Sequence, residues 1–259
     1  MGPVSAVPEP SARPTLIAVA HGTRKAPGLA EIRRLIEVVR SLRPDLRVEL
    51  AWLEQADPLL PAVLAAVTGP AVVVPALLST GYHVKTDITR AVAGRPRTVV
   101  AAQLGPDDRL TDLVHDRLVA ARAATGRAAA GRAAAGSDRA SHRPGILLLA
   151  SGSSDPEAAE QAETVGRGLA ERAGVAVLVR YLNDPNWRAG VPDGVEVANY
   201  LLAPGFFDDR LQERARELSA PAAAQPLGAD PAVARVLLDR YEALASSVPA
   251  STGPSSRTP

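Results

Sequence analysis

Two histidines and a glutamate stand where buried strands of the first half of the chain are predicted to end. His21 and Glu54 directly follow apolar runs, and His83 lies just past a third run, in the string ALLSTGYHVK at 76–85. The whole chain has only four histidines. Two imidazoles and a carboxylate are ligands that divalent first-row metals accept, and three protein ligands leave coordination positions open for a substrate. These residue types therefore predict a metal site.

The same three residues also have a structural interpretation. A histidine at the end of a strand often serves as a hydrogen-bonded structural residue, and Glu54 could cap the helix that follows it. The choice between the two interpretations depends on whether the elements around these residues bring their side chains together.

Hydrophobic periodicity predicts the elements that must position these residues. In the first half we expect strands at 15–20, 48–53, 71–78 and 98–103, and helices at 29–42, 58–67, 87–92 and 108–121. In the second half we expect strands at 145–150, 175–182, 195–202 and, shorter, 222–225, and helices at 156–173, 207–218 and from 231. Apolar runs separated by helices indicate parallel sheets in an α/β fold, whose ligands bind at the carboxyl ends of the strands.

The two halves repeat one pattern. The string LIAVAHGTRKAP aligns with LLLASGSSDPEA when Gly22 is matched to Gly152, VPALLSTGYHVKTDITRA aligns with ANYLLAPGFFDDRLQERA, and ELAWLEQADP aligns with VRYLNDP across a small gap. The alignment places Ser151, Asn183 and Phe207 opposite His21, Glu54 and His83. Glycines and Asp-Pro pairs persist in both copies while all three candidate ligands change together. This favours a functional site in the first half.

The repeat also suggests a division of the chain. We expect disordered tails at 1–14 and 247–259, a domain carrying the active site at 15–122, a flexible linker at 123–144, and a degenerate repeat of the domain at 145–246. The linker is rich in alanine, but its recurring glycines each cost a helix about 1 kcal/mol. Asp57, Asp155 and Asp230, each followed by proline, are expected to cap helices, and so is Asp87.

Composition excludes several classes of protein and of site. Hydrophobic residues make up 46% of the 259-residue chain, and the formal net charge of +1 favours neither nucleic acid nor an anionic membrane as partner. The absence of cysteine excludes disulfides and thiolate-held metals. No apolar stretch approaches the ~18 residues of a membrane span, and the N-terminus does not read as a signal peptide, so we expect a cytoplasmic protein. No P-loop or dinucleotide motif follows the first strand.

Three strings in the first half resemble one known family. HGT after the first strand, AWLEQADPLLPAVLAAV and VVVPALLSTGYHVKTDI are similar to the sirohydrochlorin chelatases of the class II (CbiX/SirB) type. The resemblance covers roughly 15–120, with a weaker copy in 145–245. PALLSTGYHVKTDI is specific to the family, whereas HGT alone is a weak signal. The resemblance implies a chelatase-like fold of two α/β domains facing a cleft, in the long fused form with its C-terminal site lost, and we expect a monomer.

The same resemblance implies an activity. The family inserts Fe²⁺ or Co²⁺ into sirohydrochlorin, a macrocycle with eight carboxylates, without ATP, as a lyase of siroheme or cobalamin biosynthesis. Ni²⁺ remains compatible with the ligand types. By resemblance, His21 and His83 are the catalytic residues, and His21, Glu54 and His83 hold the metal. No cofactor is expected beyond that substrate metal.

Binding of so anionic a substrate calls for cations and hydrogen-bond donors around the metal. The expected substrate-binding residues are Gly22, Thr23, Arg24, Lys25, Ser79, Thr80, Gly81, Tyr82 and Lys85. Arg24 and Lys25 could instead belong to a solvated loop, and Tyr82 could pack in the core. A non-catalytic tetrapyrrole or metal carrier using the same cleft is the alternative function, and an unrelated α/β binding module is a third.

Overall fold

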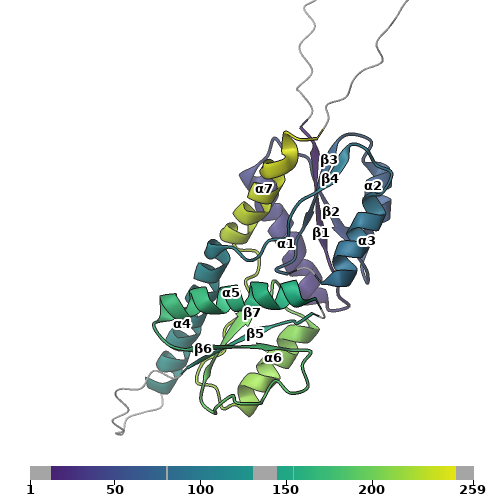
Figure 1. The fold of residues 1–259 in the computed structure, drawn as a ribbon. Helices are drawn as coiled ribbons and strands as arrows, with labels where there is room; N and C mark the ends of the chain where they lie inside the picture. The colour runs from purple at the N-terminus through teal and green to yellow at the C-terminus, as the bar shows by residue number, and fades with distance from the viewer. Residues whose placement is uncertain (1–12, 80, 131–144, 154, 249–259) are drawn as a thin grey trace, which may run out of the picture.

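The computed structural model describes residues 13–79, 81–130, 145–153 and 155–248, and for residues 82–84 and 127–130 the backbone alone. The described residues form two parallel sheets covered by helices (Figure 1). The first sheet has the strand order β2-β1-β3-β4 and the second has the order β6-β5-β7. The predicted fold class, two duplicated α/β units with parallel sheets, is confirmed.

The elements follow the predicted order. Residues 13–130, the first half, contain β1 (Thr15–Ala20), α1 (Ala26–Leu42), β2 (Val48–Trp52), α2 (Leu60–Ala66), β3 (Ala71–Pro75), α3 (Tyr82–Val92), β4 (Thr98–Val100) and α4 (Asp108–Ala130). Residues 145–248, the second half, contain β5 (Ile146–Ala150), α5 (Pro156–Ala173), β6 (Val177–Tyr181), β7 (Glu196–Tyr200), α6 (Phe206–Glu217) and α7 (Pro231–Ala245).

The central strand of each sheet is buried on both faces. Along β1, Leu16 packs in a core that also contains Leu148 of β5, whereas the next residue, Ile17, packs under α2 and α3. Leu147 of β5 likewise turns away from the shared core and packs against residues of α6. Successive strand residues point to opposite faces, so one face of each sheet contributes to a core common to both halves.

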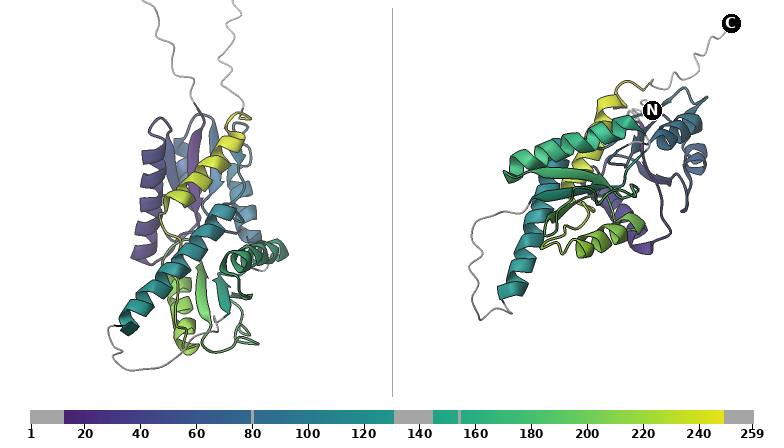
Figure 2. Two further views of the ribbon diagram at one scale, coloured as in Figure 1. Left: turned by 90° about the vertical axis from the view of Figure 1, so that its left-hand side faces the viewer. Right: turned by 60° about the horizontal axis from the view of Figure 1, so that its bottom comes forward.

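The last helix of each half packs on the other half. The first half's α4 lies against α5 and β7, and the second half's α7 lies against α1 and β3 (Figures 1 and 2). The two exchanged helices also contact each other. Because of this exchange, the halves cannot separate without exposing the core that they share.

A matching pair of arginines secures the exchange. Arg240 of α7 donates a hydrogen bond to the carbonyl oxygen of Leu104 at 3.0 Å, and Arg117 of α4 donates to that of Leu227, also at 3.0 Å. Each arginine also reaches the aspartate that stands three residues after that leucine, at 3.4 and 3.2 Å respectively. The same three residue types therefore make these two contacts in both directions, as a duplicated unit predicts. In addition, Arg240 Nε donates to the carbonyl oxygen of Gln103 at 3.0 Å, whereas Arg117 Nε has no hydrogen-bond partner among the described residues. We call the two arginines with these contacts the arginine clamps.

Helix α3 begins earlier than predicted. It starts at Tyr82, with Gly81 as its N-cap residue, so the expected cap at Asp87 is wrong. Asp87 lies inside the helix and pairs with Arg90 at 3.5 Å. No residue between Gly81 and Asp87 interrupts a helix. His83 therefore lies in the first turn of α3 and not in a loop.

The three Asp-Pro pairs that were predicted to cap helices do not behave alike. Asp155 and Asp230 cap α5 and α7, and each accepts a hydrogen bond from the backbone N–H two residues later, at 3.0 and 2.9 Å. The expected cap at Asp57 is wrong, because α2 begins at Leu60 with Leu59 as its N-cap residue. Pro61 takes the place in the first turn of α2 that Pro58 was expected to take.

Three other expectations concern the linker, the two tails and the last strand. Helix α4 continues to Ala130, into the predicted linker, because its alanines favour a helix by more than Gly126 disfavours it. The rest of that linker, 131–144, and most of both predicted tails, 1–12 and 249–259, lie outside the described residues. The expected strand near 222–225 is reduced to an isolated bridge between Val197 and Ala223. The described helices include none long and apolar enough to cross a membrane.

Replacing Arg240 with alanine tests the exchange. We expect Arg240→Ala to lower the free energy of unfolding by about 1–3 kcal/mol, because it leaves half-buried carbonyl oxygens without a donor. Arg90→Ala is the control, since Arg90 is exposed and pairs only with Asp87 in the part of the chain that the structure describes. It should cost less than about 0.5 kcal/mol. If urea unfolding showed that both variants lose the same free energy of unfolding, the arginine clamp of Arg240 would not stabilise the exchange.

Candidate functional site

The hydrogen bonds that extend the β1–β2 ladder bring His21 and Glu54 together. Leu53 N donates to Ala20 O at 2.9 Å, and Glu54 N donates to His21 O at 3.0 Å. The two side chains leave the same edge of the sheet and are both exposed, with 3.6 Å between His21 Nδ1 and Glu54 Oε1. Gln55 Nε2 donates to the same Glu54 oxygen at 2.8 Å. The predicted proximity of these two residues is therefore found in the structure.

A glycine makes this close approach possible. Gly22 has φ +100°, and a Cβ atom at this position would stand 1.8 Å from the carbonyl oxygen of Glu54. Gly152 in the second half has φ +87°, and its Cβ would stand 1.9 Å from Oδ1 of Asn183. The loop after the central strand thus meets the residue after the neighbouring strand in both halves. This equivalence supports the alignment of Glu54 with Asn183 across the gap.

The third predicted ligand, His83, is placed by its backbone alone. Ala76 N donates to Val19 O at 2.8 Å, so β3 ends at the same edge of the sheet as β1. The chain then enters α3, whose first turn contains Tyr82 and His83. The side chains of both residues, and Thr80 entirely, lie outside the described part of the structure. Among the side chains that are described, no three His, Asp or Glu gather as a metal site, and the triad His21, Glu54 and His83 stays a prediction.

His21 lies where two hollows meet between the halves. The large hollow, of about 690 Å³, is lined by His21 and Glu54 on one side and by the loop and helix start at 201–208 on the other. The small hollow, of about 390 Å³, also includes His21 and extends to Ser151 and Tyr181 in the second half. We call the two hollows together the cleft. Its size falls in the range of small-molecule sites.

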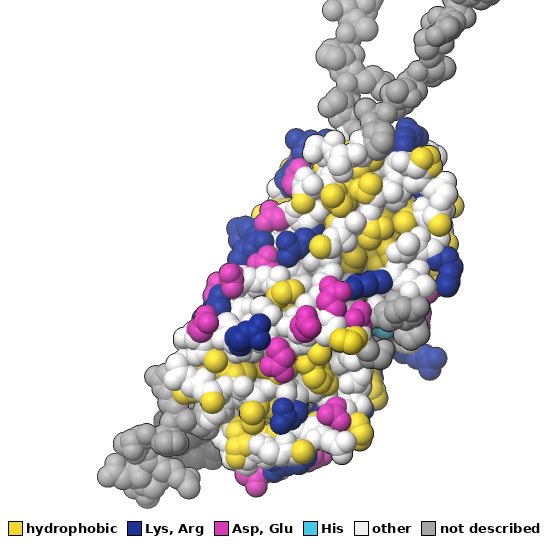
Figure 3. All heavy atoms as spheres, in the orientation of Figure 1, with side chains coloured by type: hydrophobic (Ala, Val, Ile, Leu, Met, Phe, Trp, Pro, Cys, Tyr) yellow, Lys and Arg dark blue, Asp and Glu magenta, His cyan; other side chains and the backbone are white. Residues whose placement is uncertain are grey.

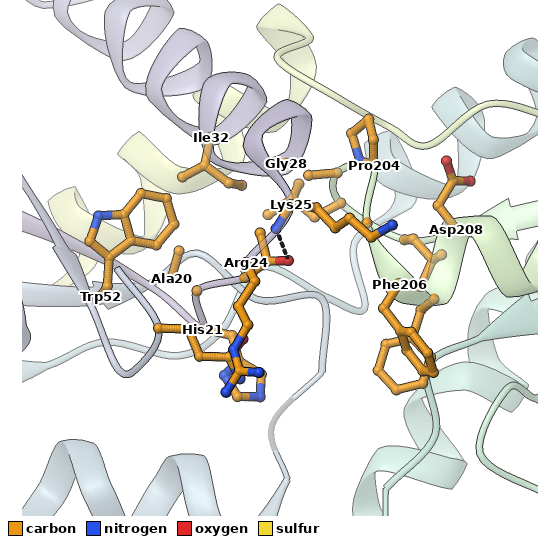
Figure 4. A pocket seen from close by; sticks show the side chains of 18 of the residues that line it. Ala20, His21, Arg24, Lys25, Gly28, Ile32, Trp52, Pro204, Phe206 and Asp208 are labelled. Atoms are coloured by element: carbon orange, nitrogen blue, oxygen red, sulfur yellow. Dashed lines mark hydrogen bonds between the residues drawn. The ribbon is translucent and has the colours of Figure 1, made fainter. Parts of the chain in front are cut away.

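The second half presents aromatic rings to the cleft. Phe206 is exposed, and its ring meets that of Phe207 edge to face with 5.5 Å between the centroids. Figure 4 shows His21 and Trp52 on the first half's side of the large hollow and Phe206 across from them. Apolar walls with a polar edge at His21 suit a flat ring that carries its charges at the periphery.

The expected substrate-binding residues divide into three groups. Gly22, Thr23, Arg24 and Lys25 line the large hollow, and Ser79 and Gly81 line the small one. Lys85 lies outside both linings, and Thr80 and the side chain of Tyr82 fall outside the described residues. Thr23 Oγ1 accepts a hydrogen bond from Lys25 N at 3.1 Å, which fixes the loop (Figure 4).

Both predicted lysines are paired with carboxylates of the second half. Lys25 Nζ lies 3.1 Å from Asp209 Oδ2. Lys85 Nζ lies 3.6 Å from Asp155 Oδ2 and hydrogen-bonds Glu157, and this bond raises the pKa of the lysine. Lys25 therefore has a partner across the cleft, although its side chain is 55% exposed.

Acidic residues on the second half's side of the cleft were missed by the sequence interpretation. Asp208 lines the large hollow, accepts a hydrogen bond from Asn199 Nδ2 at 2.9 Å, and has a pKa raised by burial. Asp209 and Asp155 hold the two lysines. The internal repeat carried a usable signal, because it aligns Lys25 with Asp155 and Lys85 with Asp209.

Comparison with known proteins agrees with this architecture. The CbiX family model matches residues 15–121. Fe³⁺-bound SirB from Bacillus subtilis is similar over 91% of this chain and 96% of its own, with 20% identity and a TM-score of 0.68. The structure of CbiX, the terminal enzyme of siroheme biosynthesis in denitrifying bacteria, is similar over 88% of this chain and 98% of its own, with 22% identity and a TM-score of 0.60.

A third solved structure shares the fold over part of its length. A multidomain protein of Deinococcus radiodurans, described as structurally similar to chelatases, matches over 89% of this chain and 55% of its own, with 23% identity and a TM-score of 0.59. Curated protein sequences give no significant match. At these identities the structural likenesses establish the fold of both halves, a chelatase-like pair of α/β units facing a cleft.

Replacing Gly22 with alanine tests the approach of the two loops. We expect Gly22→Ala to lower the free energy of unfolding by at least about 2 kcal/mol, because the new Cβ meets a backbone oxygen and the residue has a positive φ. Gly69→Ala is the matched control, since a Cβ there meets nothing within 4 Å, and it should be neutral. Thermal melts of both variants measure this, and a neutral Gly22→Ala would refute the described contact.

Proposed function

We propose that the chain is a chelatase of the CbiX type, because the CbiX family model matches residues 15–121, and that it inserts a divalent metal into sirohydrochlorin. The observation that carries the proposal is the His21–Glu54 pair, which stands 3.6 Å apart at the carboxyl edge of the first sheet and opens into the cleft. No equivalent pair exists at Ser151 and Asn183 of the second half. We therefore assign the reaction to the first half.

The residues of the cleft match what metal insertion requires. The metal replaces two pyrrole N–H protons of the macrocycle, so the site must hold a cation and accept protons. His21, Glu54 and His83 are the proposed metal ligands. A neutral imidazole has one free lone pair, which can bind the metal or, once the metal has passed to the macrocycle, accept a proton, so His21 and His83 are also the proposed proton acceptors.

The walls of the cleft match the shape of the proposed substrate. Phe206, which is exposed, offers apolar surface on which one face of the ring could lie. Arg24 lines the same hollow, and no ion pair engages it among the described residues. We propose that Arg24 binds a peripheral carboxylate, together with the loop 22–25 and with Ser79, Thr80, Gly81, Tyr82 and Lys85.

The identity of the metal and of the pathway belongs to the proposal. Fe²⁺ and Co²⁺ both suit two imidazoles and a carboxylate, and Ni²⁺ is a weaker candidate. The likeness to Fe³⁺-bound SirB and to the CbiX of siroheme biosynthesis supports iron and siroheme over cobalt and cobalamin. We also propose a cytoplasmic monomer with domains at 15–122 and 145–246, in which the second half serves as the opposite wall of the cleft.

Alanine in place of either histidine tests the reaction. Purified protein should metallate sirohydrochlorin with Fe²⁺ or Co²⁺ faster than the uncatalysed rate, as followed by the change in absorption spectrum. His21→Ala and His83→Ala should each lower that rate at least about 100-fold, because each removes both a ligand and a proton acceptor.

His115→Ala provides the control for this experiment. His115 lies on α4, faces Asp116 with 3.7 Å between Nδ1 and Oδ1, and lines neither hollow. The metallation rate of the His115→Ala variant should equal that of the unchanged protein. Unchanged rates for the His21 and His83 variants would refute the mechanism, and tight tetrapyrrole binding without any acceleration would identify a carrier instead.

Binding of the metal alone tests the role of Glu54. We expect Glu54→Gln to weaken Co²⁺ binding at least about 10-fold, because an amide oxygen is a poorer, uncharged ligand. The visible absorption of bound Co²⁺ reports this without tetrapyrrole. Glu37→Gln removes an equal charge from an exposed pair with Arg40 and should change nothing. Equal Co²⁺ affinities of the two variants would exclude Glu54 as a ligand.

A further inference from the structure

The two lysines beside the cleft have aspartates as their counterparts in the repeat. In the aligned strings HGTRK and SGSSD, Lys25 stands opposite Asp155, and in GYHVK and GFFDD, Lys85 stands opposite Asp209. The charge is therefore inverted at both equivalent positions, and in the same sense. The first half carries both cations and the second half carries both anions.

The fold brings these four residues into two reciprocal pairs. Lys25, before α1, pairs with Asp209 in the first turn of α6, at 3.1 Å. Lys85, in the first turn of α3, pairs with Asp155 before α5, at 3.6 Å, and also with Glu157. The two pairs are equivalent contacts, related by the duplication, with the partners exchanged. Lys25 of the first pair lines the large hollow. The second pair, Lys85 with Asp155, lies beside two residues that line the small hollow, because Lys85 N donates to Gly81 O at 3.2 Å and Asp155 N donates to Ser153 Oγ at 3.1 Å.

These pairs are held weakly enough to be exchanged. The side chains of Lys25 and Asp209 are 55% and 61% exposed, and those of Lys85 and Glu157 are 42% and 56% exposed, whereas Asp155 is 17% exposed. Exposed ion pairs contribute little to stability. The helix exchange, with its shared core and arginine clamps, already holds the halves together. A carboxylate of a ligand could therefore replace the aspartate on either lysine without separating the halves.

We propose that Asp209 and Asp155, the latter with Glu157, compete with the carboxylates of an anionic tetrapyrrole for Lys25 and Lys85 and so limit the affinity of the cleft. The proposal rests on the proposed function, since it assumes that ligand. The carboxylates of the second half occupy the lysines and also repel the ligand's like charge. Both effects weaken the hold on a polyanion, which favours release of the metallated product.

A purely structural role for the same pairs predicts something different. If the aspartates only tied the halves together, neutralising them would lower stability and leave ligand affinity unchanged or reduced. If they compete with the ligand, neutralising them raises affinity. The two roles therefore predict changes of opposite sign, and a single binding experiment separates them.

The experiment measures equilibrium binding of metal-free sirohydrochlorin by fluorescence at low and at physiological salt. Asp209→Asn and the double variant Asp155→Asn/Glu157→Gln should each tighten binding about three- to tenfold at low salt, with a smaller gain at higher salt. Asparagine keeps the shape of the side chain and, at position 155, still caps α5. Lys25→Gln should weaken binding.

Asp193→Asn is the matched control, because it also removes one negative charge from an exposed ion pair of the second half, with Arg188, away from the cleft. Its affinity for sirohydrochlorin should equal that of the unchanged protein. Unchanged or weaker binding by the cleft variants, or equal tightening by Asp193→Asn, would overturn the inference. Failure of the unchanged protein to bind sirohydrochlorin at all would instead overturn the proposed function.

Discussion

The exchange of α4 and α7 between the halves is the constraint on which the cleft depends. Each sheet buries one face against a helix that follows the other sheet in the sequence, so that residues of both halves share one core. A cleft between two loosely linked domains would vary in width as the linker bent. Here α4 and α7, each with its arginine, pack on the opposite half. The shared core therefore fixes the distance across the cleft between His21 and Phe206.

The two halves contribute different kinds of residue to the cleft. The first half supplies the proposed reactive edge, where the ladder of β1 with β2 ends at His21 and Glu54. The second half supplies an apolar wall and a set of carboxylates. Metal insertion into a polyanion needs a cationic, proton-accepting side and a side that does not hold the product too tightly. The distribution of side chains across the cleft is consistent with such a division.

Much of the fold and part of the site could be predicted from the sequence, because those features depend on local patterns. Apolar runs and helical spacing located the strands, and the strand ends located His21 and Glu54. The start of α3 was missed because Asp87 is a stronger cap signal than Gly81, yet no residue between them breaks the helix. The helix exchange was missed because periodicity shows which face of a helix is apolar, and not which sheet it covers. The triad with His83 stays a prediction.

After the duplication, the two copies kept some contacts in common and came to differ in others. Arg117 and Arg240 make the same contacts in the two halves, while the residues at the rim of the cleft have become opposite in charge. Contacts that hold the units together are needed twice, once in each direction, so a change in either copy would be costly. The reactive edge is needed once. Under the proposed function only the first copy holds a metal, so the second could diverge into a partner that complements the first, and a pair of equal units became an asymmetric one.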